Sequence, residues 1–301
     1  MTPAPLLPDR PGAAAVAAKG WLGAHRWLLL RRASQLFFLA LFLTGPLFGI
    51  WITKGTLASS LTLGVLPLSD PFIELQSLVA GHLPALTALT GALIVLAGYL
   101  LVGGRVYCSW VCPINPVTDA AVWLHRRFGI AKGWQPRRGT RVWLLLLALV
   151  GSAVTGTVFW ELVNPVTIFH RTLVYGLAGG WFVVLAIFLF DLLVSRRGWC
   201  SHLCPVGAFY GQLNRFALLK VSARGRAACD DCMDCFAVCP EPHVITPALR
   251  ATEPDRSPVI RHHDCTNCAR CIDVCAKDVF AFALRSDRSE VSARPHLAPE
   301  S

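Results

Sequence analysis

The chain has 301 residues and a net charge of +10, and 54% of its residues are hydrophobic while only 15% are charged. Together with a mean hydropathy of +0.52, these values exclude an ordinary soluble globular domain and are typical of a protein with several membrane spans. The positive charge alone would also suit nucleic-acid binding, so its distribution along the chain has to decide between the two classes.

Residues 1–32 form a basic segment with five Lys and Arg side chains against one acid, Asp9. The only apolar run before Trp21 is short (Ala13–Ala18), and no cleavage pattern follows it, so we expect no signal peptide. Trp21 and Trp27 are predicted to be interfacial anchors, which places the first membrane span just after this segment.

Four apolar stretches are long enough to cross the hydrocarbon core of a membrane as helices. They cover about residues 33–53, 83–103, 142–162 and 172–194. Pro46 should kink the first helix or end it near the far side of the membrane. The segment 54–82 between the first two spans is predicted to be a mildly apolar loop.

Basic side chains are concentrated on one side of these spans. The loop 104–141 carries seven of them against one acid, and the N-terminal segment carries five, whereas each of the other two loops has one. Loops rich in Lys and Arg stay in the cytoplasm, so we expect a multi-pass protein with both termini cytoplasmic. The charge is then a signal of membrane topology. No aromatic and basic binding module accompanies it, so we expect no nucleic-acid partner.

The membrane part, residues 33–220, contains an internal repeat. Two C-x3-C-P motifs follow the second and fourth predicted spans, with the cysteines Cys108, Cys112, Cys200 and Cys204. Each motif has an arginine three places before its first cysteine, Arg105 and Arg197. The pairs Asp70-Pro71 and Asn164-Pro165 precede the second and fourth spans. This predicts two parallel copies of a two-helix unit, which bring both motifs to the cytoplasmic face.

Three interpretations of these four cysteines stay open. They are candidate ligands of one metal or iron–sulfur centre, because soft thiolates suit such centres. They also suit redox-active or partner-contacting thiols, or small buried residues at a tight helix crossing. In each motif the i,i+4 spacing places the two cysteines on one face of a helical turn.

The other eight cysteines lie in two copies of C-x2-C-x2-C-x3-C between Cys229 and Cys275. This spacing is that of bacterial ferredoxins with two [4Fe–4S] clusters, in which the fourth cysteine of each run binds the other cluster. Two identical runs favour clusters over a zinc site or a disulfide framework. The predicted ligands are Cys229, Cys232, Cys235 and Cys275 for the first cluster, and Cys265, Cys268, Cys271 and Cys239 for the second.

These runs define the C-terminal organisation. We expect residues 206–220 to form a membrane-surface helix that leads into an α+β domain like a two-cluster bacterial ferredoxin at 221–284. The polar tail 285–301 is predicted to be disordered.

Taken together, these stretches resemble the NapH family, membrane-bound ferredoxin-type components of the periplasmic nitrate reductase system. The resemblance covers about Trp21 to Leu284 and rests on YCSWVCPINPVTD, GWCSHLCPVGAFYG, CMDCFAVCPEPHV and CTNCARCIDVCAKDVF. Ala276 stands where the first run has Pro240, a position that shapes a turn and is not a ligand.

The resemblance implies a quinol dehydrogenase component of the bacterial inner membrane. Such a protein oxidises quinol from the membrane pool and passes electrons, with a NapG-type iron–sulfur partner, towards a periplasmic nitrate reductase. A centre at the C-x3-C-P cysteines would be an intermediate station across a hydrocarbon core of about 30 Å. The alternative is an assembly or regulatory factor for a respiratory metalloenzyme.

Ionisable groups in the loops on the far side of the membrane are candidates for accepting the protons of a bound quinol. These groups are Asp70, Glu74, His82, Glu161 and His170. Asp191 lies inside the fourth predicted span, and the nearby Arg196 and Arg197 predict an interfacial ion pair for it.

Overall fold

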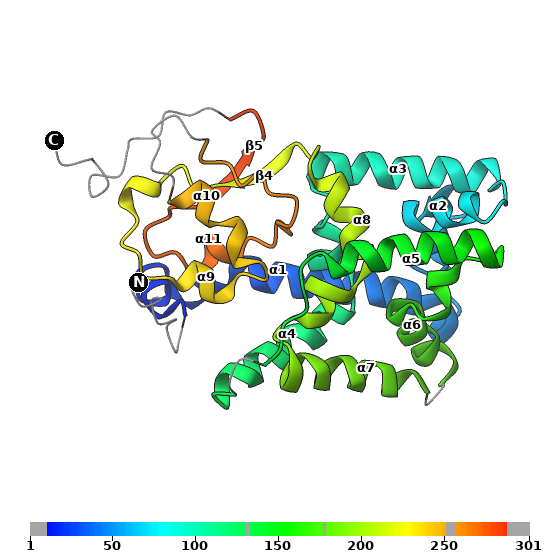
Figure 1. Cartoon of the computed structure of the whole chain (residues 1–301), viewed down its shortest axis with the longest axis horizontal. Helices are drawn as coiled ribbons and strands as arrows, with labels where there is room; N and C mark the ends of the chain where they lie inside the picture. Colours follow the sequence, from blue (N-terminus) through cyan, green and yellow to red (C-terminus); the bar gives the residue numbers. More distant parts are fainter. Residues whose placement is uncertain (1–10, 131–132, 177–178, 251–256, 288–301) are drawn as a thin grey trace. The chain divides into compact units, whose positions relative to one another are not determined.

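The computed structural model describes residues 11–130, 133–176, 179–250 and 257–287. The remaining parts of the predicted N-terminal segment and C-terminal tail lie outside these ranges. The chain forms two compact units. Among the described residues, the first unit contains 11–32, 100–109, and everything from 211 onward, and the second contains 33–99 and 110–210. Figure 1 labels the elements of both units.

The long helix α1 contributes to both units. It runs from Ala13 to Phe48, with a break in its helical backbone at Gly20, where φ is 75°. A positive φ of this kind costs glycine little because it has no Cβ atom. The helix therefore begins well before the predicted span of 33–53. It also ends earlier, because Gly49 adopts the left-handed conformation with φ of 73° and its amide donates to the carbonyl of Gly45. Pro46 lies inside the last turn.

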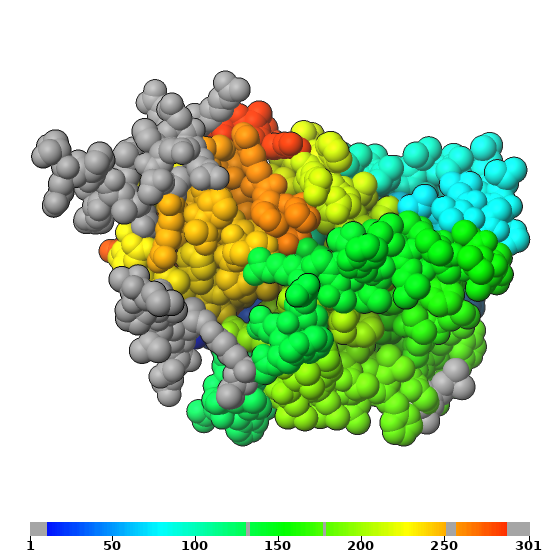
Figure 2. Space-filling view, in the orientation of Figure 1, coloured from blue at the N-terminus to red at the C-terminus, as the bar shows by residue number. Residues whose placement is uncertain are grey.

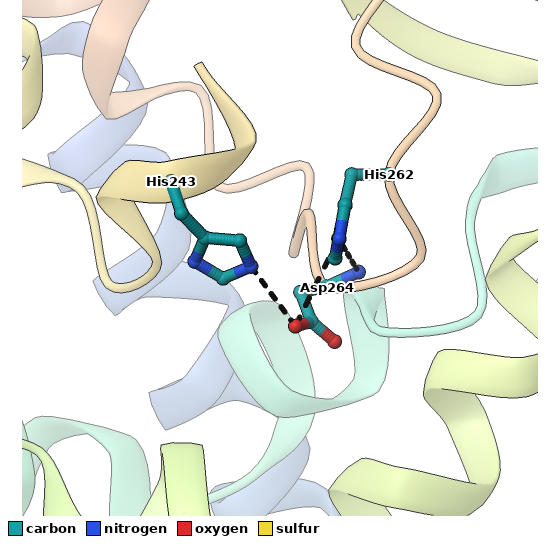
Figure 3. Close-up of side chains that lie close together, drawn as sticks. All are labelled: His243, His262 and Asp264. Carbon is teal, nitrogen blue, oxygen red and sulfur yellow. Dashed lines mark hydrogen bonds and ion pairs between the residues drawn. The ribbon is translucent and has the colours of Figure 1, made fainter. Parts of the chain in front are cut away.

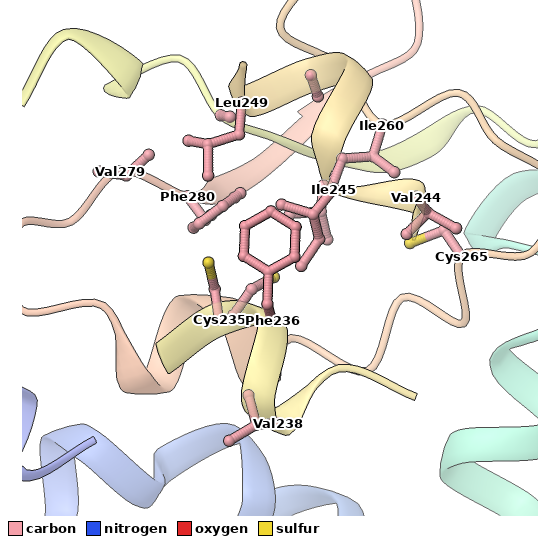
Figure 4. Close-up of a cluster of buried hydrophobic side chains, with 14 of the residues drawn as sticks. Cys235, Phe236, Val238, Val244, Ile245, Leu249, Ile260, Cys265, Val279 and Phe280 are labelled. Atoms are coloured by element: carbon pink, nitrogen blue, oxygen red, sulfur yellow. The ribbon is translucent and has the colours of Figure 1, made fainter. Parts of the chain in front are cut away.

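The first unit has a small antiparallel sheet and several short helices. Strands β4 (Leu219–Ser222) and β5 (Ala281–Leu284) pair with Leu219 opposite Leu284. The helical segments between them are η5 (Arg226–Ala228), α9 (Asp234–Val238), η6 (Pro242–Val244), α10 (Thr246–Leu249) and α11 (Arg270–Val274). Their apolar side chains form one buried core around Phe236 and Ile245 (Figure 4).

The start of this unit corrects one expectation. The surface helix predicted over 206–220 is helix α8 (Pro205–Asn214), which ends six residues earlier. Lys220 instead lies in β4, because this strand completes the small sheet with β5. Strand pairing between segments 60 residues apart is a tertiary effect that the local sequence does not encode.

The second unit begins with a feature that the sequence did not predict. The expected loop 54–82 contains a three-stranded antiparallel meander, formed by β1 (Thr53–Gly55), β2 (Ser59–Thr62) and β3 (Leu66–Ser69). Helix α2 (Pro71–Val79) follows it directly. The helix after α2 is α3 (Leu86–Val102), and its Gly91 allows strand β3 to approach it closely. A Cβ atom at Gly91 would lie 3.0 Å from the carbonyl oxygen of Pro67.

Three apolar helices in the second unit are shorter than predicted. They are α3 (Leu86–Val102), α5 (Thr140–Thr155) and α7 (Gly179–Leu189), the last extended to Val194 by the π-helical turn η3 (Phe190–Val194). Helix α5 ends at Gly156 in the left-handed conformation, and the 3₁₀ turn η2 (Phe159–Leu162) follows. The predicted span 172–194 is wrong as a single helix, because Gly176 ends α6 (Pro165–Tyr175) in the same way.

Three helix contacts order the second unit. Helix α5 packs against α2, and α7 packs against both α6 and α4 (Ile114–Arg127), a helix in the segment predicted to be the loop 104–141. Side chains of α5, green in Figure 2, form a stretch of the surface of this unit. Large apolar residues of α5 are exposed there, with Trp143 73% and Val154 81% accessible.

Among the described residues, α1 is the one helix both long and apolar enough to cross a membrane by itself. The apolar helices α3, α5 and Gly179–Val194 have 10 to 17 residues. The four-span architecture therefore stays a prediction.

Candidate iron–sulfur site

The eight cysteines of the two runs line two cavities in the first unit. The first cavity is bordered by Cys229, Cys232, Cys235 and Cys275, and the second by Cys239, Cys265, Cys268 and Cys271. They contain about 350 and 360 Å³ of empty space. In both, three cysteines come from one run and the fourth comes from the end of the other. The structure thus brings together each of the two sets of four thiols named above.

The two runs share an unusual backbone. In the first run, Asp231 and Met233, which flank the second cysteine, have φ values of 58° and 64°. Asn267 and Ala269 occupy the same places in the second run, with φ values of 47° and 58°. Non-glycine residues adopt this left-handed conformation at a cost, so it marks a site where the fold imposes the geometry. Here it curls each loop around its cavity.

The chemistry of these thiols fits iron–sulfur clusters. Burial raises the pKa of Cys232 to about 11 and of Cys235 to about 12. In the second set, burial raises the pKa of Cys265 to about 11, and it also raises the pKa of Cys271 well above the ordinary thiol value. The free thiols are therefore neutral, and a cluster that needs four thiolates would release their protons on binding. The core residues around the cavities, including Phe236 and Phe280, limit water access.

Buried cations surround the second cavity. The Arg105 guanidinium donates to the Glu241 carboxylate at 3.2 Å and to the backbone carbonyl of Asp264 at 2.8 Å. Burial opposes the charge of Arg105, but the negative charges of Glu241, Cys108 and Asp264 together outweigh that effect and raise the pKa. Lys220 is fully buried and donates to the backbone and side-chain oxygens of Asn214, whose amide donates to the Cys265 carbonyl at 2.8 Å. The sequence pattern singled out Arg105, but it predicted neither the pairing of Arg105 with Glu241 nor the burial of Lys220 beside the second cavity.

The loop around the second cavity is also bonded to Val102, which precedes the first C-x3-C-P motif, and to Ser109 within it. Asn267 donates to the carbonyl of Val102 at 3.0 Å, and the Ser109 hydroxyl donates to the carbonyl of Thr266 at 2.8 Å. Gly103 has φ of 130°, and a Cβ atom there would lie 2.6 Å from the Asn267 amide nitrogen. Cys108 therefore belongs to a segment fastened to the second cavity.

More acidic residues line the first cavity than the second, where Glu241 is the one acid among the described lining residues. Asp230, Asp231 and Asp234 line it, and Asp230 and Asp231 are exposed together with Cys232. The N-terminal part of α1 contacts the ends of the short helices nearby. The amide of Gly12 donates to Asp234 at 2.9 Å, and the amides of Trp27 and Leu28 donate to Asp273 at 3.0 Å each.

Both C-x3-C-P motifs are π-helical turns, η1 (Tyr107–Val111) and η4 (Trp199–Leu203), where an ordinary helical turn was expected. π-turns are rare and often occur at functional sites. Within the second unit, Arg197 forms an ion pair with Asp119 at 2.7 Å, and the Cys200 thiol lies 3.8 Å from the Thr118 hydroxyl. The Asp191 carboxylate accepts the amide hydrogen of Trp199 at 2.9 Å, so it caps η4. The expected ion pair with Arg196 and Arg197 is thus replaced by a capping role.

The two predicted polar-Pro turns start equivalent helices. Asp70 accepts the amide hydrogen of Phe72 at 2.8 Å before α2, and Asn164 accepts that of Val166 at 3.1 Å before α6. Asp70 is also bonded to the Tyr210 hydroxyl at 3.0 Å. Burial raises the pKa of Asp70 to about 6, and the charge of Glu161 adds to the rise.

The other candidate proton acceptors differ in burial. Glu74 is buried, which raises its pKa. Glu161 accepts from Asn164 at 2.9 Å and from the Thr167 hydroxyl. His82 lies 2.8 Å from the carbonyl of Gly156. Burial lowers the pKa of His170, which packs against Phe42. Asp70 and Glu161 are the two of these five groups that lie close enough to influence each other's charge.

Two runs of cysteines around two cavities in a small α+β unit define a ferredoxin-type iron–sulfur protein. A protein-family model described as a 4Fe-4S dicluster domain matches residues 228–279, and one described as a 4Fe-4S binding domain matches both 84–131 and 177–224. The chain is 52% identical to the ferredoxin-type protein NapH of Escherichia coli over 276 residues, 91% of this chain and 95% of that protein. No solved structure matches it.

Two other relatives are equally similar in extent. The methylamine utilization ferredoxin-type protein MauN of Paracoccus denitrificans is 57% identical over 271 residues, 90% of this chain and 95% of that protein. NapH of Haemophilus influenzae is 48% identical over 270 residues, 90% of this chain and 94% of that protein. The chain belongs to the ferredoxin-type protein family that contains NapH and MauN.

Proposed function

We propose that this chain is an inner-membrane electron-transfer protein that oxidises quinol and passes electrons, with a NapG-type iron–sulfur partner, towards a periplasmic nitrate reductase. The observation that carries the proposal is the pair of cavities, each lined by four cysteines, in one compact unit. In this proposal the first cluster is held by the set with Cys229 and Cys275, and the second by the set with Cys239 and Cys265. Full-length similarity to NapH supports the nitrate reductase system.

Membrane attachment is supported by the composition of the chain and by α1. The shorter apolar helices α3, α5 and Gly179–Val194 would complete four spans, with both termini cytoplasmic according to the distribution of basic loops. Helices of this length cover about 24–26 Å at 1.5 Å per residue, slightly less than a hydrocarbon core of about 30 Å. The segments α2 and α6 would enter the membrane only partly.

Oxidation of a quinol releases two electrons and two protons, so the site needs proton acceptors. We propose Asp70 and Glu161 for this role, because both are carboxylates near the start of α2 or α6. The raised pKa of Asp70, about 6, suits a group that takes and releases protons near neutral pH. A further iron–sulfur centre at the C-x3-C-P cysteines is supported by the 4Fe-4S binding-domain match to both copies of the motif.

The test is anaerobic purification in detergent, iron counting, and EPR after a reduced quinol analogue is added. Two clusters require about eight iron atoms per chain, and a third would raise the count to about twelve. We expect cluster reduction by the quinol in the wild type. Chains with full iron content that stay oxidised would contradict quinol oxidation and favour the assembly or regulatory role.

The C-x3-C-P centre has a separate test. Replacing Cys108 and Cys200 with Ser should abolish quinol-dependent nitrate reduction while both ferredoxin clusters remain visible by EPR. Unchanged nitrate reduction in this double variant would exclude the centre as an intermediate station.

One observation favours a second candidate acceptor. The identity of 57% to MauN of Paracoccus denitrificans, named a methylamine utilization protein, is higher than the 52% to the Escherichia coli NapH. The second candidate function is therefore electron transfer in methylamine utilisation. Complementation separates the two systems. The chain should restore either nitrate respiration to a strain without NapH or growth on methylamine to a strain without MauN.

A further inference from the structure

Three side chains next to the second cavity converge on one point (Figure 3). His243 lies in η6, after the first cysteine run, whereas His262 and Asp264 lie just before the second run. One ligand atom from each lies within 4.8 Å of the other two. The Asp264 atom Oδ2 is 3.1 Å from Nε2 of His243 and 3.8 Å from Nδ1 of His262.

A second layer of charged groups holds these three side chains in place. The other oxygen of Asp264, Oδ1, faces Nε2 of His263 at 3.3 Å and the Arg105 guanidinium at 3.8 Å. The other ring nitrogen of His243, Nδ1, faces the Glu241 carboxylate at 3.7 Å. Metal-binding histidines commonly have a carboxylate at their second nitrogen, which fixes the ring and makes it a better ligand.

We propose that His243, His262 and Asp264 form a binding site for a divalent transition-metal ion such as Zn²⁺, separate from the cluster cysteines. Two imidazoles and one carboxylate suit ions of this class, and water can complete a tetrahedral shell. The ion binds Nε2 of His243, Nδ1 of His262 and Oδ2 of Asp264.

The hydrogen bonds favour these ligand atoms. Nδ1 of His262 accepts the amide hydrogen of Asp264 at 3.2 Å, so this nitrogen carries a lone pair and no proton. Metal binding displaces that bond and the proton shared between His243 and Asp264. Because Oδ1 of Asp264 is already held by Arg105 and His263, Oδ2 is left for the ion.

Burial gives the site both protection and an entrance. The side chain of Asp264 is 4% exposed, while those of His243 and His262 are 20% and 35% exposed. An ion can therefore reach the imidazoles from solvent, and the carboxylate that holds it is shielded.

An ion at this site would join two segments that flank cluster ligands. His243 lies four residues after Cys239, and Asp264 directly precedes Cys265; both cysteines line the second cavity. An ion bound to both His243 and His262 links positions that are separated by 18 residues, and this link restricts the motion of both segments. The metal-bound protein should therefore retain its second cluster longer than the metal-free protein.

The test uses the full-length protein with its clusters, purified anaerobically through a tag without histidines. After dialysis against a chelator, Zn²⁺ is titrated in competition with a chromophoric chelator, and the Zn-loaded protein is measured by X-ray absorption at the zinc edge. We expect one Zn²⁺ per chain with only nitrogen and oxygen neighbours. His243→Gln and His262→Gln should each weaken binding at least tenfold, with the iron content unchanged.

His25→Gln is the matched control, because His25 is a partly exposed histidine in the same unit that bonds to the carbonyl of Trp21. Its zinc affinity should equal that of the wild type. Three results would each overturn the proposal: no zinc binding by the wild type, wild-type zinc affinity in the variants His243→Gln and His262→Gln, or sulfur neighbours in the absorption spectrum. The absorption measurement on the wild type needs no variant, so a variant that loses iron does not remove the test.

Discussion

The two cluster cavities have the same cysteine spacing and the same left-handed loop residues, yet their surroundings differ. In the first run, Cys232 and its neighbours Asp230 and Asp231 are exposed. In the second run, Cys265, Cys268 and Cys271 are each less than 10% exposed, and the buried cations Arg105 and Lys220 lie beside them. A duplicated ligand pattern thus fixes how a cluster is held, while the segments packed on it decide how accessible and how positive its surroundings are.

This difference suggests separate duties for the two sites. A cluster near solvent and acids can exchange electrons with a soluble partner, whereas a buried one suits transfer within the chain. Arg105 is paired with the carboxylates of Glu241 and Asp264. The buried ammonium of Lys220 is instead bonded to the uncharged Asn214. The positive charge of Lys220 stabilises the extra negative charge of a reduced cluster, so the second cluster should have the higher potential. The following predictions test the contrast, beginning with the largest effect.

Arg105→Gln should damage the second site most. It removes the charge that neutralises Glu241 and leaves buried carboxylates unpaired, which costs about 3–5 kcal/mol. We expect loss of the second cluster, read as about four fewer iron atoms per chain and a simplified EPR spectrum. Arg197→Gln changes the equivalent arginine of the repeat, whose partner is Asp119. It should leave both ferredoxin clusters in place; equal cluster loss in the two variants would contradict the assignment.

A chelator should remove the clusters in a fixed order. Because Cys232 is exposed, whereas Cys265, Cys268 and Cys271 are buried and Cys239 is partly buried, the first cluster should be lost at least tenfold faster, equivalent to about 1.4 kcal/mol of barrier. Bleaching of the iron–sulfur absorption in anaerobic chelator should therefore show two phases. Assignment comes from Cys275→Ser, which should lose the fast phase alone. A single phase would show that the two sites are equally protected.

Lys220→Met should lower the potential of the second cluster by about 59 mV, which is a tenfold change in the one-electron equilibrium. Methionine keeps the length of the side chain and removes its charge. EPR-monitored redox titration would measure the shift, and the first cluster serves as the internal reference. An unchanged gap between the two potentials would rule out Lys220 as the cause of the difference.

Asp231→Asn should give the smallest effect. The carboxylate of Asp231 is 3.2 Å from Arg250 but exposed, so water and salt screen it. The potential of the first cluster should rise by less than about 30 mV, half of the shift for a tenfold equilibrium change. The rise should shrink further at high ionic strength, whereas the Lys220→Met shift should not. A salt-independent rise would mean that Asp231 is effectively buried near the cluster.

Some features could be predicted from the sequence because they are local. The cysteine spacing forecast two sets of four thiols, and the structure groups the thiols in those sets. The pairs Asp70-Pro71 and Asn164-Pro165 indicated matching turns in both copies, and both start helices with the same capping bond. Apolar stretches located α3, α5 and α7, although glycines ended two helices before the hydropathy did.

Other features depend on contacts between distant segments and could not be read locally. The strands of the meander are three or four residues long, too short for a clear alternating pattern. Arg105 donates to Glu241, which lies 136 residues further along the chain. The sequence contained His243 and His262, but only the folded loop shows that both face Asp264. The π-turns at the C-x3-C-P motifs were missed because i,i+4 spacing suits an ordinary helix equally well.

The bonds between the start of α1 and the cluster region also determine when α1 can pack during synthesis of the chain. Gly12 meets Asp234 across 222 residues of sequence. At about 5–20 residues per second, a ribosome needs roughly 10–45 s to make that interval. During this period the first turns of α1 exist while their partner loops do not. The N-terminal helix can therefore pack against the ferredoxin region only after Asp234 and Asp273, one in each cysteine run, have left the ribosome.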